Sequence, residues 1–247
     1  MTTTVLATRP SPTAHTVRRL AAALLQLARW FWLIAVVVIV LANVVGWATH
    51  GSTDVSIAVY ARQACTWFPF SLSIMLVNAY LRVHVASGMT RRTFVRAALV
   101  VEVVAGIVYA VLLTSLVLIE RAVHDSLGWT STITEVQLAD ASAPAWALLV
   151  DLAVPFVLAN LSGLVVGVVY LRGGAWWGTL TLPLTVGPLL VLLYAPGLRL
   201  MSLPGVWTTV SDLQALGFAA GLGVALSVLT ALVFASVAGR APVTATS

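Results

Sequence analysis

One acidic side chain, Glu102, stands inside a long apolar stretch, where an ionisable residue is a functional candidate. Asn78 and Arg82 belong to the preceding apolar stretch, and a contact between Glu102 and either of them would tie the two stretches together. The alternative chemistry is proton relay. We favour the structural contact, because a buried carboxyl needs a partner and isolated acids do not form a proton wire.

Asp151 is the second acid within an apolar stretch. It lies about 9 Å from the start of the stretch that begins at Ala145, given a helical rise of about 1.5 Å per residue. This depth suits an outward-facing vestibule, where the carboxylate would have a substrate or proton role. It also suits an ion pair with Arg62 or Arg121, and the sequence leaves both readings open.

The known catalytic constellations do not come together in this sequence. The four histidines are far apart and near the ends of apolar stretches, so they form neither a zinc pair nor a dyad with Ser162. All 13 basic residues are arginine, which leaves no lysine for a phosphate-binding P-loop. We therefore predict that the chain is not an enzyme and binds no metal or cofactor of its own.

A basic turn separates the second and third apolar stretches. Gly88 permits a tight turn, and Thr90 can cap the helix that follows. Arg91 and Arg92 come next, and the apolar side chains of Met89 and Phe94 stand among these charges. The turn either anchors the topology or presents an apolar tip, ringed by arginines, to a cytosolic partner.

The composition is that of a membrane protein. Of 247 residues, 60% are hydrophobic and 9% are charged, whereas soluble domains carry about 25% charged residues. A helix needs about 20 apolar residues to cross a bilayer. Six stretches meet that length and predict an all-α protein with six transmembrane helices: 30–48, 67–85, 95–119, 145–170, 175–194 and 213–237.

The arginines predict the orientation of these spans, since cytoplasmic segments carry an excess of basic residues. With both termini inside, only Arg62, Arg121 and Arg199 fall outside. The remaining arginines are cytoplasmic: Arg9, Arg18, Arg19, Arg29, Arg82, Arg91, Arg92, Arg96, Arg172 and Arg240. The net charge of +5 is thus a topology signal, and we predict no binding to nucleic acid.

The segments around the spans divide the chain further. Residues 1–14 predict a disordered tail, 30–237 the transmembrane domain, and 238–247 a cytoplasmic tail. Residues 15–29 predict an amphipathic helix in the headgroup plane, with an N-terminal extension of the first span as the alternative. The external loop 120–144 shows no binding motif.

The fifth span holds several helix breakers. Pro183, Gly187 and Pro188 suggest a broken helix, although a kinked but ordinary helix fits as well. Prolines and glycines at 196–205 suggest an external hairpin that dips back into the membrane. Pairs of glycines four residues apart predict close helix packing: Gly163 and Gly167, and Gly217 and Gly221. Tryptophans near the span ends, such as Trp30 and Trp32, read as interfacial anchors.

This layout resembles the permease subunits of type-2 ABC exporters. The stretch Ala86-Ser-Gly-Met-Thr-Arg-Arg-Thr-Phe94 is similar to that family's small-Gly-x-Ser/Thr-Arg-Arg-x-Phe turn. The resemblance implies that this turn docks on a cytosolic ATPase. It also implies six spans with cytoplasmic termini, an amphipathic connecting helix and re-entrant external segments. By the same resemblance, ATP-driven motion would pass through a set of turn residues: Gly88, Met89, Thr90, Arg91, Arg92 and Phe94.

Two function classes remain open. The first is a bacterial cytoplasmic-membrane permease that pairs with a second permease subunit and exports a hydrophobic or amphipathic substrate by alternating access. ATP and Mg would then be bound by the separate cytosolic ATPase. The second is a non-transporting polytopic membrane protein, such as an immunity, assembly or sensor factor. An intramembrane enzyme is disfavoured by the missing catalytic constellation.

Overall fold

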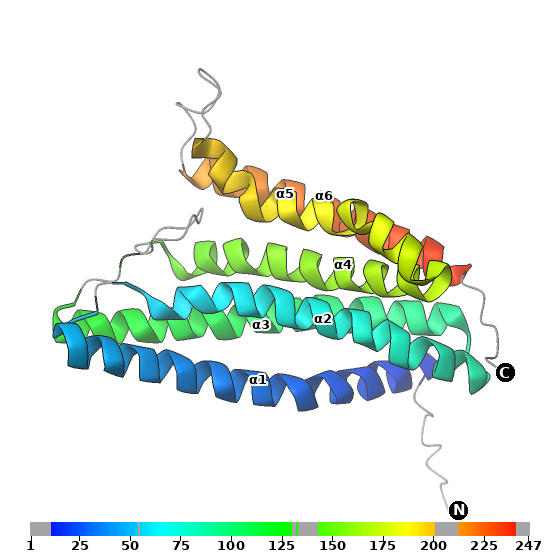
Figure 1. Cartoon of the computed structure of the whole chain (residues 1–247), viewed down its shortest axis with the longest axis horizontal. Coiled ribbons are helices and arrows are strands. Elements are labelled where there is room, and N and C mark those ends of the chain that lie inside the picture. The colour runs from blue at the N-terminus through cyan, green and yellow to red at the C-terminus, as the bar shows by residue number, and fades with distance from the viewer. Residues whose placement is uncertain (1–10, 54, 130–131, 133–142, 201–211, 241–247) are drawn as a thin grey trace, which may run out of the picture.

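Six helices make up nearly all of the computed structural model, which describes residues 11–53, 55–129, 132, 143–200 and 212–240. Their bounds are α1 (Pro12–His50), α2 (Ile57–Ala86), α3 (Arg91–Leu127), α4 (Ala145–Leu180), α5 (Leu182–Leu200) and α6 (Asp212–Gly239). Successive helices run in opposite directions (Figure 1). Consequently the start of α1, the α2–α3 turn and the end of α6 share one end of the bundle, which we call the turn end.

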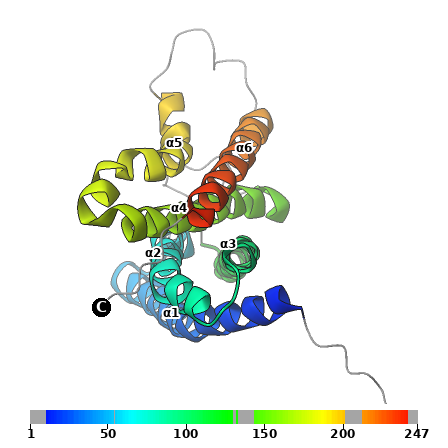
Figure 2. The same ribbon diagram turned by 90° about the vertical axis from the view of Figure 1, so that its right-hand side faces the viewer.

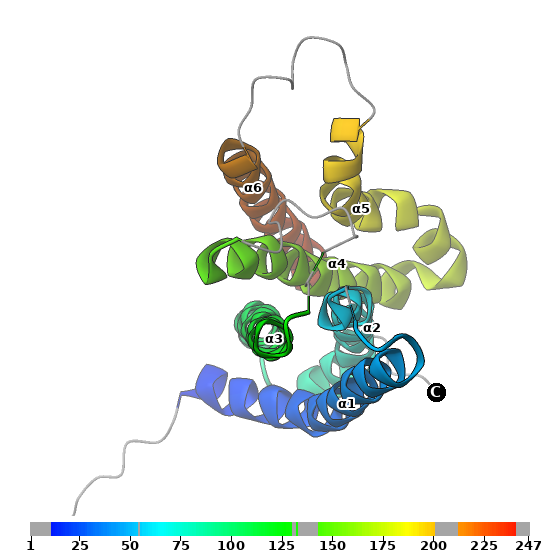
Figure 3. The same cartoon turned by 90° about the vertical axis from the view of Figure 1, so that its left-hand side faces the viewer.

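The helices form layers around α4 (Figures 2 and 3). On one side α4 packs on α2 and α3, and α1 lies outside those two; on the other side it meets α5 and α6. The sequence of α4 is apolar all round, which is typical of a helix enclosed by others. The described residues contain no strand, and Val55 and Thr132 form one isolated bridge.

Glycines bring α4 close to its neighbours, as the sequence predicts. A Cβ atom on Gly163 would lie 2.4 Å from the carbonyl oxygen of Phe70 in α2. One on Gly167 would lie 3.0 Å from the carbonyl oxygen of Ile74. The small residues of α4 are therefore used for packing within the chain. Gly217 and Gly221 of α6 have open space in front of them instead.

The membrane class is supported by five helices. α1, α2, α3, α4 and residues Gln214–Gly239 of α6 are long and apolar enough to cross a bilayer. α5 is shorter in its apolar part, Leu182–Tyr194. Together these helices indicate a multi-pass membrane protein.

The predicted fifth span, 175–194, is divided between two helices. Its first residues belong to α4, beyond a kink at Gly174, whose φ of 71° and ψ of −174° no helix allows. α5 then begins at Leu182, so Pro183 stands in its first turn, where proline costs no hydrogen bond. Of the two readings, the broken helix is the one observed: the break inside the predicted span falls at Thr181, just before Pro183, and Pro188 stands within α5.

The predicted border between an interfacial helix (15–29) and a first span (30–48) is absent from the backbone, since α1 runs unbroken through both. No proline or glycine interrupts 15–29, and the apolar side chains of Val17, Leu20 and Leu24 pack on the rest of the protein. This is the arrangement of the alternative reading, an extension of the first span.

The ends of the predicted segments also shift. α1 begins at Pro12, inside the predicted tail, and residues 1–10 lie outside the described part. α3 continues to Leu127, so the predicted loop 120–144 starts as helix. Most of the predicted re-entrant hairpin, 201–205 included, and the tail from 241 onward also fall outside the described residues.

Candidate functional site

The α2–α3 turn has the local structure that its residues predict. Gly88 adopts a φ of 80°, a left-handed conformation that glycine takes without strain. The hydroxyl of Thr90 caps α3 by accepting from the backbone N–H of Thr93 at 3.3 Å. The turn is thus tight, and its geometry is fixed at both ends.

The side chains of the turn divide into two groups. Thr90 and Arg92 are exposed, and Met89 and Arg91 are half-buried. Phe94 is 0% exposed, with its ring centroid 5.6 Å from that of His84. The prediction that Phe94 forms part of an exposed apolar tip is therefore wrong. The reason is its register, because Phe94 lies on the face of α3 that packs into the bundle.

Phe94 belongs to a hydrophobic cluster that joins five helices. The cluster contains Leu20 of α1, Leu81 of α2, Leu164 of α4 and Phe234 of α6, besides residues of α3. A displacement of the turn would therefore also shift the residues that pack on Phe94 in every helix except α5.

Exposed arginines gather at the turn end of the bundle. They are Arg18, Arg19, Arg82, Arg92, Arg96, Arg172 and Arg240. Arg172 of α4 also donates to the carbonyl of Val237 in α6, at 3.3 Å, which joins two helix ends there. Arg29 is not at the turn end. Phe31, two residues further on, stacks on Phe68 and contacts Tyr109, the middle residue of α3, so Arg29 lies near the middle of the bundle.

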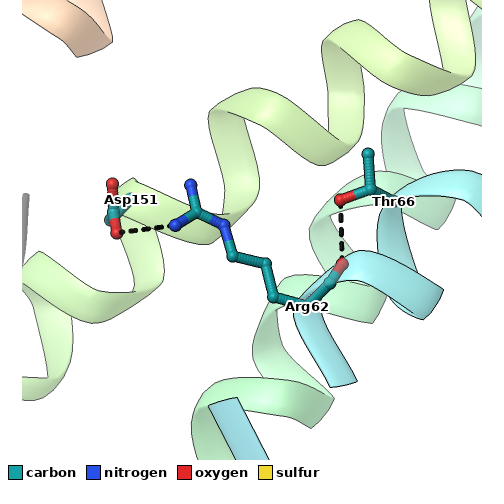
Figure 4. A network of polar contacts seen from close by, with 3 residues as sticks. All are labelled: Arg62, Thr66 and Asp151. Carbon is teal, nitrogen blue, oxygen red and sulfur yellow. Dashed lines mark hydrogen bonds and ion pairs between the residues drawn. The ribbon is translucent and has the colours of Figure 1, made fainter. Parts of the chain in front are cut away.

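Asp151 pairs with Arg62, one of the two partners that the sequence offers. The Nη1 atom of Arg62 in α2 lies 3.9 Å from Oδ2 of Asp151 in α4, and both side chains are buried (Figure 4). The carbonyl of Arg62 accepts from the Thr66 hydroxyl at 2.9 Å. Arg121 turns elsewhere and donates to the carbonyl of Ala143 at 3.2 Å.

Glu102 is buried, but not with the predicted partners. Asn78 is exposed and donates to the carbonyl of Ile74 in its own helix, and Arg82 is exposed near the turn. The neighbours of Glu102 are Ser73 of α2, beside its carboxyl, and Asn160 of α4, which donates to its backbone carbonyl at 3.0 Å. Neither Asn160 nor Ser73 stood out in the sequence, because each is a lone polar residue in an apolar helix.

A third acid, Glu120, forms a network that the sequence did not reveal. Its carboxylate accepts from the backbone N–H groups of Ile57 (3.0 Å) and Ala58 (3.1 Å), at the start of α2. The hydroxyl of Ser56 and the amide of Asn43 (2.8 Å) also donate to it. This carboxylate therefore caps α2 and ties α1 to it.

His124 extends the same network. Its Nε2 atom lies 3.1 Å from Oδ1 of Asn43, and its ring packs edge-on against Trp129. Within the described residues, no group of three or more His, Cys, Asp or Glu side chains gathers as a metal site would. The network joins the ends of α1, α2 and α3. Asn43, a lone polar residue in an apolar stretch, was the one hint of it in the sequence.

Comparison with known proteins yields no matching protein-family model, curated protein or solved structure.

Proposed function

We propose that this chain is the transmembrane permease subunit of an ATP-driven exporter of the type-2 ABC kind. One observation supports this proposal above the others. A tight basic turn projects Arg92 at one end of the bundle, while Phe94, two residues on, is packed in a cluster from five helices. A cytosolic protein that moved this turn would move the bundle with it.

In this proposal the turn end of the bundle faces the cytoplasm of a bacterium. Exposed arginines at that end agree with the rule that basic residues stay inside, and both termini would be cytoplasmic. The fifth helix, although its apolar part is short, would be the remaining span. Arg62, which would lie on the outer side, has its charge paired with Asp151.

The partner subunit would supply the chemistry. A separate cytosolic ATPase would bind ATP and Mg and dock on Gly88, Met89, Thr90, Arg91 and Arg92. Phe94 would act from inside, by holding the turn to the bundle. A second permease subunit would complete the pathway, through which a hydrophobic or amphipathic substrate leaves by alternating access.

The test is purification from native membranes in nanodiscs, followed by mass spectrometry of the proteins that come with the chain. We expect a P-loop ATPase in stoichiometric amount. The double variant Arg91→Ala/Arg92→Ala should lose most of it, because the docking charges are gone. Phe94 is left unchanged, since its removal would damage the fold whatever the turn does.

Arg18→Ala/Arg19→Ala is the matched control. It removes the same charge from exposed positions at the turn end, on α1 instead of the turn. This variant should keep the ATPase. Loss of the ATPase in both variants would show that only the net charge matters. A chain that repeatedly purifies without any ATPase would favour the non-transporting alternative and sink the proposal.

A further inference from the structure

A lateral groove runs between α1 and α3. It has a volume of about 650 Å³, which lies within the range of small-molecule sites, and its walls are mostly apolar. Leu24 and Val36 of α1 and Val104 and Leu112 of α3 are among its lining residues. A second hollow of about 500 Å³ continues it toward the other end of the bundle and shares Val36 with it.

Three residues that line the first groove each carry a buried polar atom without a hydrogen-bond partner. These atoms are the carboxyl Oε1 of Glu102, the phenol oxygen of Tyr109 and the indole Nε1 of Trp32. The sequence predicted Trp32 as an interfacial anchor, but its ring centroid lies 5.2 Å from that of Tyr109. Buried polar groups without a partner are costly, and they mark places where a ligand can supply one.

The positions of these three side chains indicate what kind of ligand would fit the groove. Glu102 and Tyr109 are seven residues apart on α3, which is about 10 Å along the helix axis. Glu102 is the more deeply buried, at 1% exposed, and its carboxyl accepts hydrogen bonds and donates none when it is ionised. Trp32 and Tyr109 border the groove with mainly aromatic surface, which suits the apolar body of a ligand.

We propose that the α1–α3 groove binds an elongated amphipathic amine, with its ammonium group at Glu102 and its apolar body between the helices. A carboxyl in an apolar wall favours a cation that donates hydrogen bonds. Arg29 also borders the groove, but it is exposed and its guanidinium lies 5.7 Å from the ring centroid of Trp30. The positive charge of Arg29 repels an ammonium group from its part of the groove. The ammonium group would therefore bind at Glu102.

The proposal does not depend on an ATPase or on a second permease subunit. All the residues that carry it belong to one chain, and the binding needs no ATP. If the chain is an exporter, the groove names an amphipathic amine as its substrate class. If it is not, the groove remains a ligand site, so the two proposals fail separately.

The experiment uses the full chain in nanodiscs of zwitterionic lipid and tritiated dodecylamine as the probe, with empty nanodiscs to subtract partition into lipid. We expect saturable binding of one dodecylamine per chain. Glu102→Gln should weaken it at least tenfold, because the charge-assisted hydrogen bond is lost. Glu102→Asp should keep part of the affinity. Asp125→Asn, which removes an exposed carboxylate of α3 outside the groove, should leave binding unchanged.

Each contrary result overturns the proposal. Binding that never saturates above the empty nanodiscs would mean that lipid chains alone fill the groove. Unchanged affinity in Glu102→Gln would remove the ammonium partner. Dodecanoate, the matched anion, should not bind saturably. If it does, and Arg29→Gln abolishes that binding, the groove is an anion site. Matching thermal midpoints of wild type and Glu102→Gln ensure that a folded protein is compared.

Discussion

Glu120 and Glu102 lie on the same helix, five turns apart, and both are buried, at 7% and 1% exposed. Glu120 receives backbone, hydroxyl and amide donors from the starts and ends of two other helices. Glu102 has one carboxyl oxygen without any partner, and that residue lines a groove. Burial therefore does not tell a structural acid from a ligand-binding one, but the set of donors does.

Asp151 is a third buried acid, and it differs from the other two because its partner, Arg62, carries a full positive charge. Removal of one member of a buried ion pair leaves the other charge uncompensated, which costs about 3–5 kcal/mol. We expect a loss of that order for Asp151→Leu, the largest effect among these acids. The double variant Asp151→Leu/Arg62→Met should recover at least half of the loss, since no isolated charge remains.

Cys65 offers the measurement. It is the only cysteine of the chain and is fully buried, so a thiol-reactive dye reports unfolding in a denaturant titration. If the two single losses simply add in the double variant, Arg62 and Asp151 do not depend on each other and the pair has no structural role.

Glu120→Gln tests the structural role of the acid that has many donors. A glutamine amide would place N–H donors against the N–H groups of Ile57 and Ala58, and the charge at the start of α2 would be lost. We expect a loss of about 2–3 kcal/mol in free energy of unfolding. The control Asp125→Asn, an exposed carboxylate on the next turn, should change stability by less than about 0.5 kcal/mol. Equal effects of the two substitutions would show that Glu120 acts only through net charge.

Much of the fold follows from apolar length and from local turn chemistry. The long helices, the turn at Gly88 and the Thr90 cap could be predicted, since each depends on residues close in sequence. The glycine spacing also predicted close packing at Gly163, but not that Phe70 of α2 is the partner. The pair of Asp151 with Arg62 was one of two options, because spacing gives depth in the bundle but not which helices are neighbours.

The remaining features depend on tertiary register. Phe94 sits in a polar turn by sequence, yet its face of α3 is turned inward. Glu120 follows the last residue of a predicted span and was placed in a loop, but α3 continues past it for two more turns. Trp32 was placed at a membrane surface, whereas its contact with Tyr109 sets it level with the middle of α3. The depth of a residue in the bundle depends on which residues of separate helices pack together. A single sequence does not show those pairings.

Glu102→Gln should have the smallest effect on stability and so separates the two acids of α3 most clearly. Its unpartnered oxygen contributes no hydrogen bond to the folded chain, and glutamine has nearly the same shape. We expect a change within about 0.5 kcal/mol, or a small gain from removing an ionisable group from an apolar wall. The dye assay on Cys65 measures it beside Glu120→Gln. A loss as large as that of Glu120→Gln would mean that Glu102 holds the helices together, and its place in the groove would then be structural.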